Sequence, residues 1–412
     1  MNNKIFWYST PMNRIMIDEL LNKVETLVSE GYQIACSENK IKEWAGKKFM
    51  LDDRREKVNG VLKGSITLYV NENGEELKRY FAIEGDSQSR INLAKLNAGG
   101  ILKDTFKALE GHRMRDVFGI TYSDDFAKCV PKPLYFIQNG MEFLNIENVN
   151  SADVSAMYPA SGCGDLPTTK GAKTVEGYEK PSKDYPFAFY IKSGHCAEFG
   201  RFDTHDYFKL PAGLKIRLTK TPDFKDVYLN IPKNEEVTIL MKKSSRTLDS
   251  VFNYFWQKRN TVTDETEKQI CKYVMNAGIG MLHRNPKNLL NAQKYKNIPG
   301  YYHLAAIIKA RANETMLEAY KELTNRGDLI LQMIVDSIIY KSVSGVEFGQ
   351  KQKEMGKFHI EVTNGIYRSN GNINQYAIAA ENGEIIKFRC SGVKDPKIET
   401  LEDIDKYNVK ED

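Results

Sequence analysis

The stretch Ser151-Ala152-Asp153-Val154-Ser155-Ala156-Met157-Tyr158-Pro159 places one carboxylate beside a short run of small and apolar residues. This pattern predicts a strand that ends near Asp153 and turns into a helix, with the aspartate available as an N-cap. A structural role of that kind would explain the stretch if it stood alone. Two later segments, residues 272–280 and 334–340, give it a second interpretation.

The later of these segments centres on Asp336. Two aliphatic runs flank Asp336 and Ser337 between Leu329 and Tyr340, which predicts a buried hairpin whose tip carries the charge. An ordinary hairpin turn and a metal site explain this aspartate equally well. Hard divalent cations prefer carboxylate oxygens, and converging carboxylates can bind two such ions close together. If Asp153 and Asp336 converge, they supply two of those ligands.

The segment between them predicts a helix with a polar face. Lys272 and Asn276 are four residues apart and share one helical face, and Lys268 lies one turn earlier. Asp264 and Glu267 resemble a capping box at the start of this helix. A lysine-rich surface helix is the alternative, although apolar residues fill the rest of the segment.

In this order, the three segments resemble the motifs of the family B (alpha-like) DNA polymerases, most closely the protein-primed phage and plasmid branch. The family's first motif, D-x-x-S-L-Y-P, is matched at Asp153 and at Tyr158-Pro159. Its hairpin motif, Y-x-D-T-D-S, is matched by Asp336-Ser337, with Ile334 in place of the first Asp. The helix resembles K-x-x-x-N-S-x-Y-G at Lys272, Asn276 and Gly280.

The resemblance implies roles for individual residues. Asp153 and Asp336 would be catalytic and would bind two Mg²⁺ or Mn²⁺ ions per active site. The implied metal ligands are Asp153, Val154, Asp336 and Glu361. The implied nucleotide-binding residues are Arg259, Lys268, Lys272, Asn276 and Tyr158, the last as the residue that excludes a 2′-hydroxyl. The implied primer and template contacts are Gly280, Ser337, Tyr376 and Gly140.

The implied fold class is α+β, with a palm of antiparallel sheet with helices behind it, helical fingers and a small α/β N-terminal domain. The expected domains are residues 1–95, a reduced N-terminal domain; 96–240, the first part of the palm; 241–305, the fingers; and 306–412, the second part of the palm with a vestigial thumb. In the N-terminal domain the pattern predicts a helix over residues 15–31 and a hairpin over 65–83 that turns at Asn73-Gly74.

The expected function is a template-directed DNA polymerase without proofreading, in phage or mobile-element replication. Glu84 and Asp86 are the nearest approach to an exonuclease motif, and they fit a turn better. The expected partners are DNA primer-template, dNTPs, and a terminal protein or another replication factor. The alternative is a catalytically silent polymerase-fold protein that binds primer-template or a replication partner. Ile334, Asn374 in place of a family Lys, and the short thumb favour that alternative.

Composition is compatible with either function. The 412 residues are 41% hydrophobic and 27% charged, with no apolar run of membrane-spanning length and no signal-peptide pattern. The six cysteines form no C-x-x-C pair. His195, Cys196 and His205 lack metal-site spacing, and ordinary strand residues are the better interpretation. We therefore expect a cytoplasmic protein without a membrane partner.

Charge is distributed unevenly along the chain. The net charge is +5, whereas residues 241–311 contain thirteen Lys and Arg against four Asp and Glu, a local charge of +9. Aromatic residues are interleaved with these charges, at Tyr254, Trp256, Tyr295, Tyr301 and Tyr302. This pattern favours a nucleic-acid groove over a solvated helical face. The Gly- and Pro-rich stretch 163–185 is expected to be an exposed loop.

Overall fold

The computed structural model describes residues 98–138, 140–198, 235–263, 265–283, 298–372, 374–393 and 396–407, together with the backbone of six strands between residues 4 and 84. The chain forms two compact units. The first comprises Met1–Asp124, Gly162–Lys170 and Lys243–Ala305, and the second comprises Asp125–Ser161, Gly171–Lys242 and Ala306–Asp412. Palm and fingers, as domain names for these segments, remain predictions.

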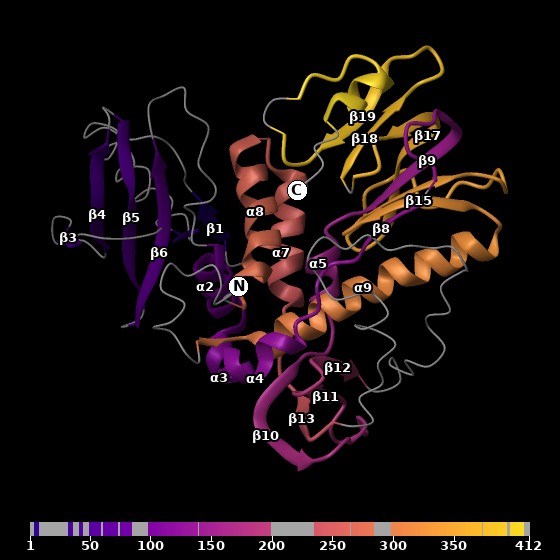
Figure 1. Cartoon of the computed structure of the whole chain (residues 1–412). Helices are drawn as coiled ribbons and strands as arrows, with labels where there is room; N and C mark the ends of the chain where they lie inside the picture. Colours follow the sequence, from indigo (N-terminus) through magenta and orange to yellow (C-terminus); the bar gives the residue numbers. More distant parts are fainter. Residues whose placement is uncertain are drawn as a thin grey trace. The chain divides into compact units, whose positions relative to one another are not determined.

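The second unit is organised around a seven-stranded antiparallel sheet (Figure 1). Its strand order is β19-β18-β17-β9-β16-β15-β8, so segments far apart in the sequence alternate across the sheet. The strands are β8 Tyr135–Ile137, β9 Ile146–Val154, β15 Leu329–Ile334, β16 Ser337–Lys341, β17 Phe358–Ser369, β18 Gln375–Ala379 and β19 Ile385–Cys390. The predicted mixture of helices with an antiparallel sheet is confirmed.

A long helix, α9 (Tyr302–Asn325), covers one face of this sheet through its residues in the second unit. Side chains alternate between the two faces of a strand, so Ala152 and Val154 of β9 pack on that side with Ala312 and Met316 of the helix. Val149 lies on the other face with a second apolar cluster. Asp153 lies four residues after Val149 on the same strand, so the two side chains share a face. The Asp153 side chain is therefore directed to the face away from α9.

Three short helical segments complete this part of the chain: α5 Met157–Ser161, η2 Ala127–Cys129 and η4 Leu401–Tyr407. The predicted helix after Asp153 is confirmed as α5. It begins four residues beyond the aspartate, however, so Asp153 does not serve as its N-cap. The carboxylate is thereby left available for another role.

A smaller four-stranded sheet has the order β10-β13-β11-β12. Its strands are β10 Pro167–Glu176, β11 Phe187–Tyr190, β12 His195–Glu198 and β13 Val237–Lys243. The expectation of a loop over residues 163–185 was wrong, because β10 runs through the middle of this stretch. An edge strand can be polar and mostly exposed, with lysines that discourage edge-to-edge pairing, so its composition resembled that of a loop. A buried ion pair between Glu198 and Arg311 joins β12 to α9, with Nε and Oε2 3.0 Å apart.

From residue 98 onward, the described part of the first unit is mostly helical. Its helices are α2 Ala98–Glu110, α3 Met114–Phe118, α7 Asp249–Thr261 and α8 Glu265–Gly280, with short strands β7 Thr121–Tyr122 and β14 Pro299–Gly300, and α4 Ser123–Phe126 at the unit boundary. The predicted helix that carries Lys272 is confirmed as α8. Helix α2 packs closely on α8 at Gly278, where an added Cβ would lie 2.9 Å from Leu102 Cδ1. The predicted cap at Asp264 lies outside the described residues.

The N-terminal backbone contains β1 Lys4–Trp7 parallel to β2 Tyr32–Ala35, and a sheet with the order β3-β4-β5-β6. The strands of that sheet are β3 Ile41–Glu43, β4 Phe49–Val58, β5 Val61–Glu72 and β6 Glu75–Glu84. Glu72 pairs with Glu75, which confirms the predicted hairpin around residues 73–74. The predicted helix over 15–31, together with Asp86 and His205, lies outside the described residues. Among the described helices, none is long and apolar enough to cross a membrane.

Candidate active site

Two aspartates meet at neighbouring strand ends of the seven-stranded sheet. Asp153 is the penultimate residue of β9, and Asp336 lies in the two-residue turn between β15 and β16. Ser337 pairs with Asp153 across the β9–β16 ladder, and the Val154 N–H donates to the Asp336 carbonyl at 2.7 Å. The structure thus brings together the two aspartates that the sequence singles out, although their binding of metal remains a prediction.

The turn that carries Asp336 has an unusual backbone. Val335 has a φ of 57°, in the left-handed region that β-branched residues rarely adopt. Its N–H donates to the Leu134 carbonyl at 3.0 Å, which holds the turn against β8 and its preceding residue. Strain of this kind persists where surrounding contacts fix the backbone, and it often accompanies functional sites.

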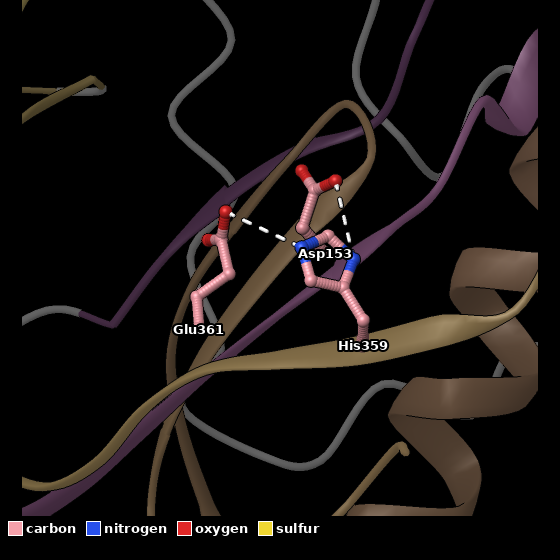
Figure 2. Close-up of side chains that lie close together, drawn as sticks. All are labelled: Asp153, His359 and Glu361. Atoms are coloured by element: carbon pink, nitrogen blue, oxygen red, sulfur yellow. Dashed lines mark ion pairs between the residues drawn. The ribbon is translucent and has the colours of Figure 1, made fainter. Parts of the chain in front are cut away.

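A third strand adds two side chains to the same place. His359 of β17 pairs with Asp153, and Glu361 lies two residues further, in a bulge between Ile360 and Val362. The His359 ring lies between the carboxylates, with Nδ1 4.0 Å from Asp153 Oδ1 and Nε2 3.8 Å from Glu361 Oε1 (Figure 2). One ligand atom from each of the three side chains can be chosen so that all lie within 4.8 Å of one another.

Electrostatic repulsion is concentrated on Asp153. Burial, followed by the negative charges of Asp336 and Glu361, raises the pKa of its carboxyl to about 7. The positive charges of Lys387 and Lys353 act in the opposite direction but do not cancel this effect. The surroundings of Asp153 therefore disfavour its ionised form, and a bound divalent cation would favour that form.

The histidine is well suited to the neutral state. Burial, and then the charge of Lys353, lower the pKa of His359. Its side chain is buried, with Nδ1 3.0 Å from Ser155 Oγ in a hydrogen bond, while Nε2 has no hydrogen-bond partner. A neutral imidazole with one unused nitrogen is the form that binds metal ions.

Lys387 and His359 are the site residues that the sequence analysis missed. Lys387 of β19 donates to Ser151 Oγ at 2.7 Å and forms an ion pair with Glu361 Oε2. The alternation of His359 and Glu361 along one strand was the available signal, because residues two apart share a face. For Lys387 the sequence offered none, because its position depends on strand order.

Tyr158 and Ser337 lie beside the aspartates. Burial, and then the charge of Asp336, raise the pKa of Tyr158, and its ring packs against the same apolar cluster as Val335, the residue before Asp336. The Ser337 side chain is buried next to Asp153 in the ladder. The side chain of Val154 packs in the core on the α9 side, so the backbone is what it can offer to a metal.

Two residues predicted to contact primer or template, Tyr376 and Gly140, lie in different surroundings. Tyr376 is 1% exposed and its ring stacks on Tyr367 with centroids 6.0 Å apart, so the ring cannot itself touch a primer in this conformation. The Lys387 ammonium lies 5.9 Å from the Tyr376 ring centroid. Gly140 lies in an exposed turn with a φ of 77°, a backbone conformation that favours glycine.

The predicted triphosphate residues lie in the first unit. Lys268, Lys272 and Asn276 recur every four residues along α8, and the side chains of Lys272 and Asn276 are exposed while Val274 is buried. Arg259, in the last turn of α7, has its guanidinium 5.9 Å from the ring centroid of Trp256. Nothing lies within 4 Å of a Cβ built on Gly280. Joint action of these residues with Asp153 remains a prediction.

The aromatic residues predicted as stacking surfaces are only partly suited to that role. Tyr254 and Trp256 are half-buried, but Tyr301 and Tyr302 are buried, with Tyr302 fully inaccessible. Their apolar packing in the first unit, rather than an open groove, explains their presence there. Tyr295 lies outside the described residues.

The antiparallel sheet with two adjacent aspartates and a long helix behind it defines a polymerase-like fold. Solved structures bear this out. The chain matches phi29 DNA polymerase in a ternary complex with primer-template DNA and incoming nucleotides at a TM-score of 0.51 and 16% identity, over 73% of this chain and 61% of that one. It also matches the post-translocation binary complex of the same polymerase, at a TM-score of 0.50 and 17% identity. This match covers 74% of this chain and 61% of the polymerase chain.

The predicted resemblance to DNA polymerases is therefore confirmed at the level of the fold, through the structures of phi29 DNA polymerase. This chain spans about 61% of the length of the phi29 polymerase structures that it matches. No protein-family model matches the chain, and no curated protein sequence matches it.

Proposed function

We propose that this chain is a template-directed DNA polymerase that joins deoxynucleotides by two-metal nucleotidyl transfer. The observation that carries the proposal is the adjacency of Asp153 and Asp336 on neighbouring strands of a polymerase-like sheet. Both phi29 complexes contain primer-template DNA, and the ternary complex also contains incoming nucleotides; we extend those ligands to this chain by analogy of fold.

The donor set suits hard divalent cations, since carboxylate oxygens are the ligands that Mg²⁺ and Mn²⁺ prefer. The high pKa of Asp153 fits this role, because a bound cation would offset the repulsion that raises it. Asp153 and Asp336 would hold the ions, with Glu361 beside them. When bound, two such cations stabilise the charge on the attacking and leaving oxygens.

The other residues would orient the substrates. Lys272, Lys268 and Arg259 would neutralise the triphosphate and fix its position, the electrostatic part of phosphoryl-transfer catalysis. Tyr158, close to Asp336, would lie beneath the sugar and exclude a 2′-hydroxyl by its ring.

The experiment is primer extension with Mg²⁺ or Mn²⁺, comparing the wild type with Asp336→Asn. Metal-assisted charge stabilisation is worth several kcal/mol, and each 1.4 kcal/mol is tenfold in rate, so we expect a loss of at least about a hundredfold. Duplex binding should be nearly unchanged. Asp184→Asn, in an exposed loop of the same unit, is the matched control. Undiminished extension by Asp336→Asn would refute the assignment.

The second candidate is a catalytically silent polymerase-fold protein that binds primer-template or a replication partner. The observation that favours it is the ion pair of Lys387 with Glu361, which places a positive charge where a cation would otherwise approach. Ile334, buried at 1% exposure, also leaves the turn with one carboxylate. Primer-template binding that is independent of metal, together with no extension in either metal, would identify this function. A terminal protein partner and a phage origin rest on the family resemblance.

A further inference from the structure

A histidine is the unexpected member of the acidic cluster. His359 lies between Asp153 and Glu361, each ring nitrogen faces one carboxylate, and its side chain is 5% exposed (Figure 2). Lysine or arginine would be the simplest neutraliser of two carboxylates, whereas a buried imidazole with a free nitrogen serves as a ligand. This residue has no counterpart in the motif positions matched above.

We propose that His359 is a metal ligand and that, with Asp153 and Glu361, it forms a mixed nitrogen and oxygen site for a divalent first-row transition ion such as Mn²⁺. The inference rests on the proposed function only in that the same Asp153 serves catalysis. The site would select its metal, because imidazole favours transition ions whereas Mg²⁺ keeps to oxygen ligands and water.

The distance between His359 and Glu361 agrees with this role. Two ligands bound to one ion at about 2.1 Å each are at most about 4.2 Å apart. Nε2 of His359 and Oε1 of Glu361 are separated by 3.8 Å, which is within that limit. The other Glu361 oxygen, Oε2, is engaged by Lys387, so Oε1 is the oxygen that faces the imidazole.

The hydrogen bonds around the ring identify the ligand atom. Buried polar atoms in proteins are nearly always hydrogen-bonded, yet His359 Nε2 has no such partner. In the tautomer with its hydrogen on Nδ1, this nitrogen donates to Ser155 Oγ, 3.0 Å away, and the lone pair is on Nε2. Ligating histidines typically donate their other ring N–H in this way. Nε2 is therefore the ligand atom.

The test is direct detection of the nitrogen ligand in the full-length protein. Metal-free protein is loaded with Mn²⁺ and examined by pulsed electron paramagnetic resonance, which detects ¹⁴N coupling from a coordinated imidazole. We expect the coupling in the wild type, its replacement by the ¹⁵N pattern in protein labelled with ¹⁵N-histidine, and its loss in His359→Gln. The control is His195→Gln, which replaces a half-buried histidine of β12 in the same unit. This variant should retain the histidine coupling.

A second measurement compares affinities. Competition between Mn²⁺ and Mg²⁺ should show the Mn²⁺ preference fall at least about tenfold in His359→Gln, by comparison with what loss of supporting contacts costs metal sites. The labelling experiment needs no variant, so a poorly folded His359→Gln would not leave the proposal untested. Absence of histidine coupling in the wild type overturns the proposal.

The two proposals can fail separately. Histidine coupling without primer extension would support the metal site and argue against the polymerase. Extension that depends on Asp336, without histidine coupling, would support the polymerase and refute His359 as a ligand.

Discussion

Replacement of Asp153 by asparagine should stabilise the metal-free protein. The Asp153 carboxyl has a pKa of about 7 instead of 3.8, chiefly because of burial and then because of repulsion by Asp336 and Glu361. The folded state therefore binds more protons at this position than the unfolded state between pH 4 and 7. Since stability rises with pH only where the unfolded state binds more protons, the wild type must lose stability across this range.

The size of the effect follows from the pKa shift. One pKa unit corresponds to about 1.4 kcal/mol, so the raised pKa of Asp153 lowers the free energy of unfolding by about 4 kcal/mol at pH 8, about 2 kcal/mol at pH 5 and almost nothing below pH 4. Asparagine removes the charge at nearly constant volume. We therefore expect Asp153→Asn to have a higher free energy of unfolding than the wild type. The difference should increase with pH, toward about 2 kcal/mol at pH 5 and about 4 kcal/mol at pH 8.

Differential scanning calorimetry in EDTA, at pH 5 and pH 8, provides the measurement. The exposed Asp184→Asn is the control, with no pH-dependent gain expected. Added Mg²⁺ or Mn²⁺ should raise the melting temperature of the wild type but not that of Asp153→Asn, because ligands that bind the folded state stabilise it. A variant no more stable than the wild type at pH 8, or a gain that does not change with pH, would refute the repulsion that we infer.

Three further predictions concern other parts of the chain. Tyr158→Ala should raise ribonucleotide use relative to deoxynucleotide use in primer extension, with Tyr158→Phe as the control that keeps the ring; an unchanged ratio would remove Tyr158 from sugar selection. Gly278→Ala should lower the melting temperature, because its Cβ would lie 2.9 Å from Leu102 Cδ1, whereas Gly280→Ala, with nothing within 4 Å, should not; equal melting temperatures would contradict the packing of α2 on α8. Burial lowers the pKa of Lys309 to about 8, so the folded state binds fewer protons between pH 8 and 10.5 and this side chain adds stability as pH rises through that range. Lys309→Met should accordingly stabilise the protein at pH 7 by up to roughly 3 kcal/mol and lose that advantage near pH 10.5, and a gain independent of pH would be inconsistent with this cause.

The sequence was most informative where local pattern determines local structure. The hairpin around Asp336 was predictable because two aliphatic runs with a charged tip have few other ways to fold. The helix that carries Lys272 followed from the spacing of its polar and apolar residues. In both cases the neighbouring residues alone contain the necessary information.

Features that depend on the order of strands in the sheet could not be predicted from local sequence patterns. His359 is close to Asp153 because β17 pairs with β9, and nothing in either segment specifies that neighbour. Lys387 reaches Ser151 from a strand further across the sheet. The edge strand β10 was mistaken for a loop because an exposed edge carries no apolar pattern. Tertiary context, not local propensity, determines each of these.

The position of Ile334 fits our proposal that further metal ligands come from β17. This residue, where the resembling family has a first aspartate, is 1% exposed and packs in an apolar cluster with Leu331 and Ile339. An ionised carboxylate there would be buried without a partner, at a cost of several kcal/mol. Asp153 is instead flanked by Asp336 on the β16 side and by His359 with its neighbouring glutamate on the β17 side. The two sides therefore differ in chemistry, with oxygen alone on one and nitrogen with oxygen on the other, and two cations bound there would not be equivalent.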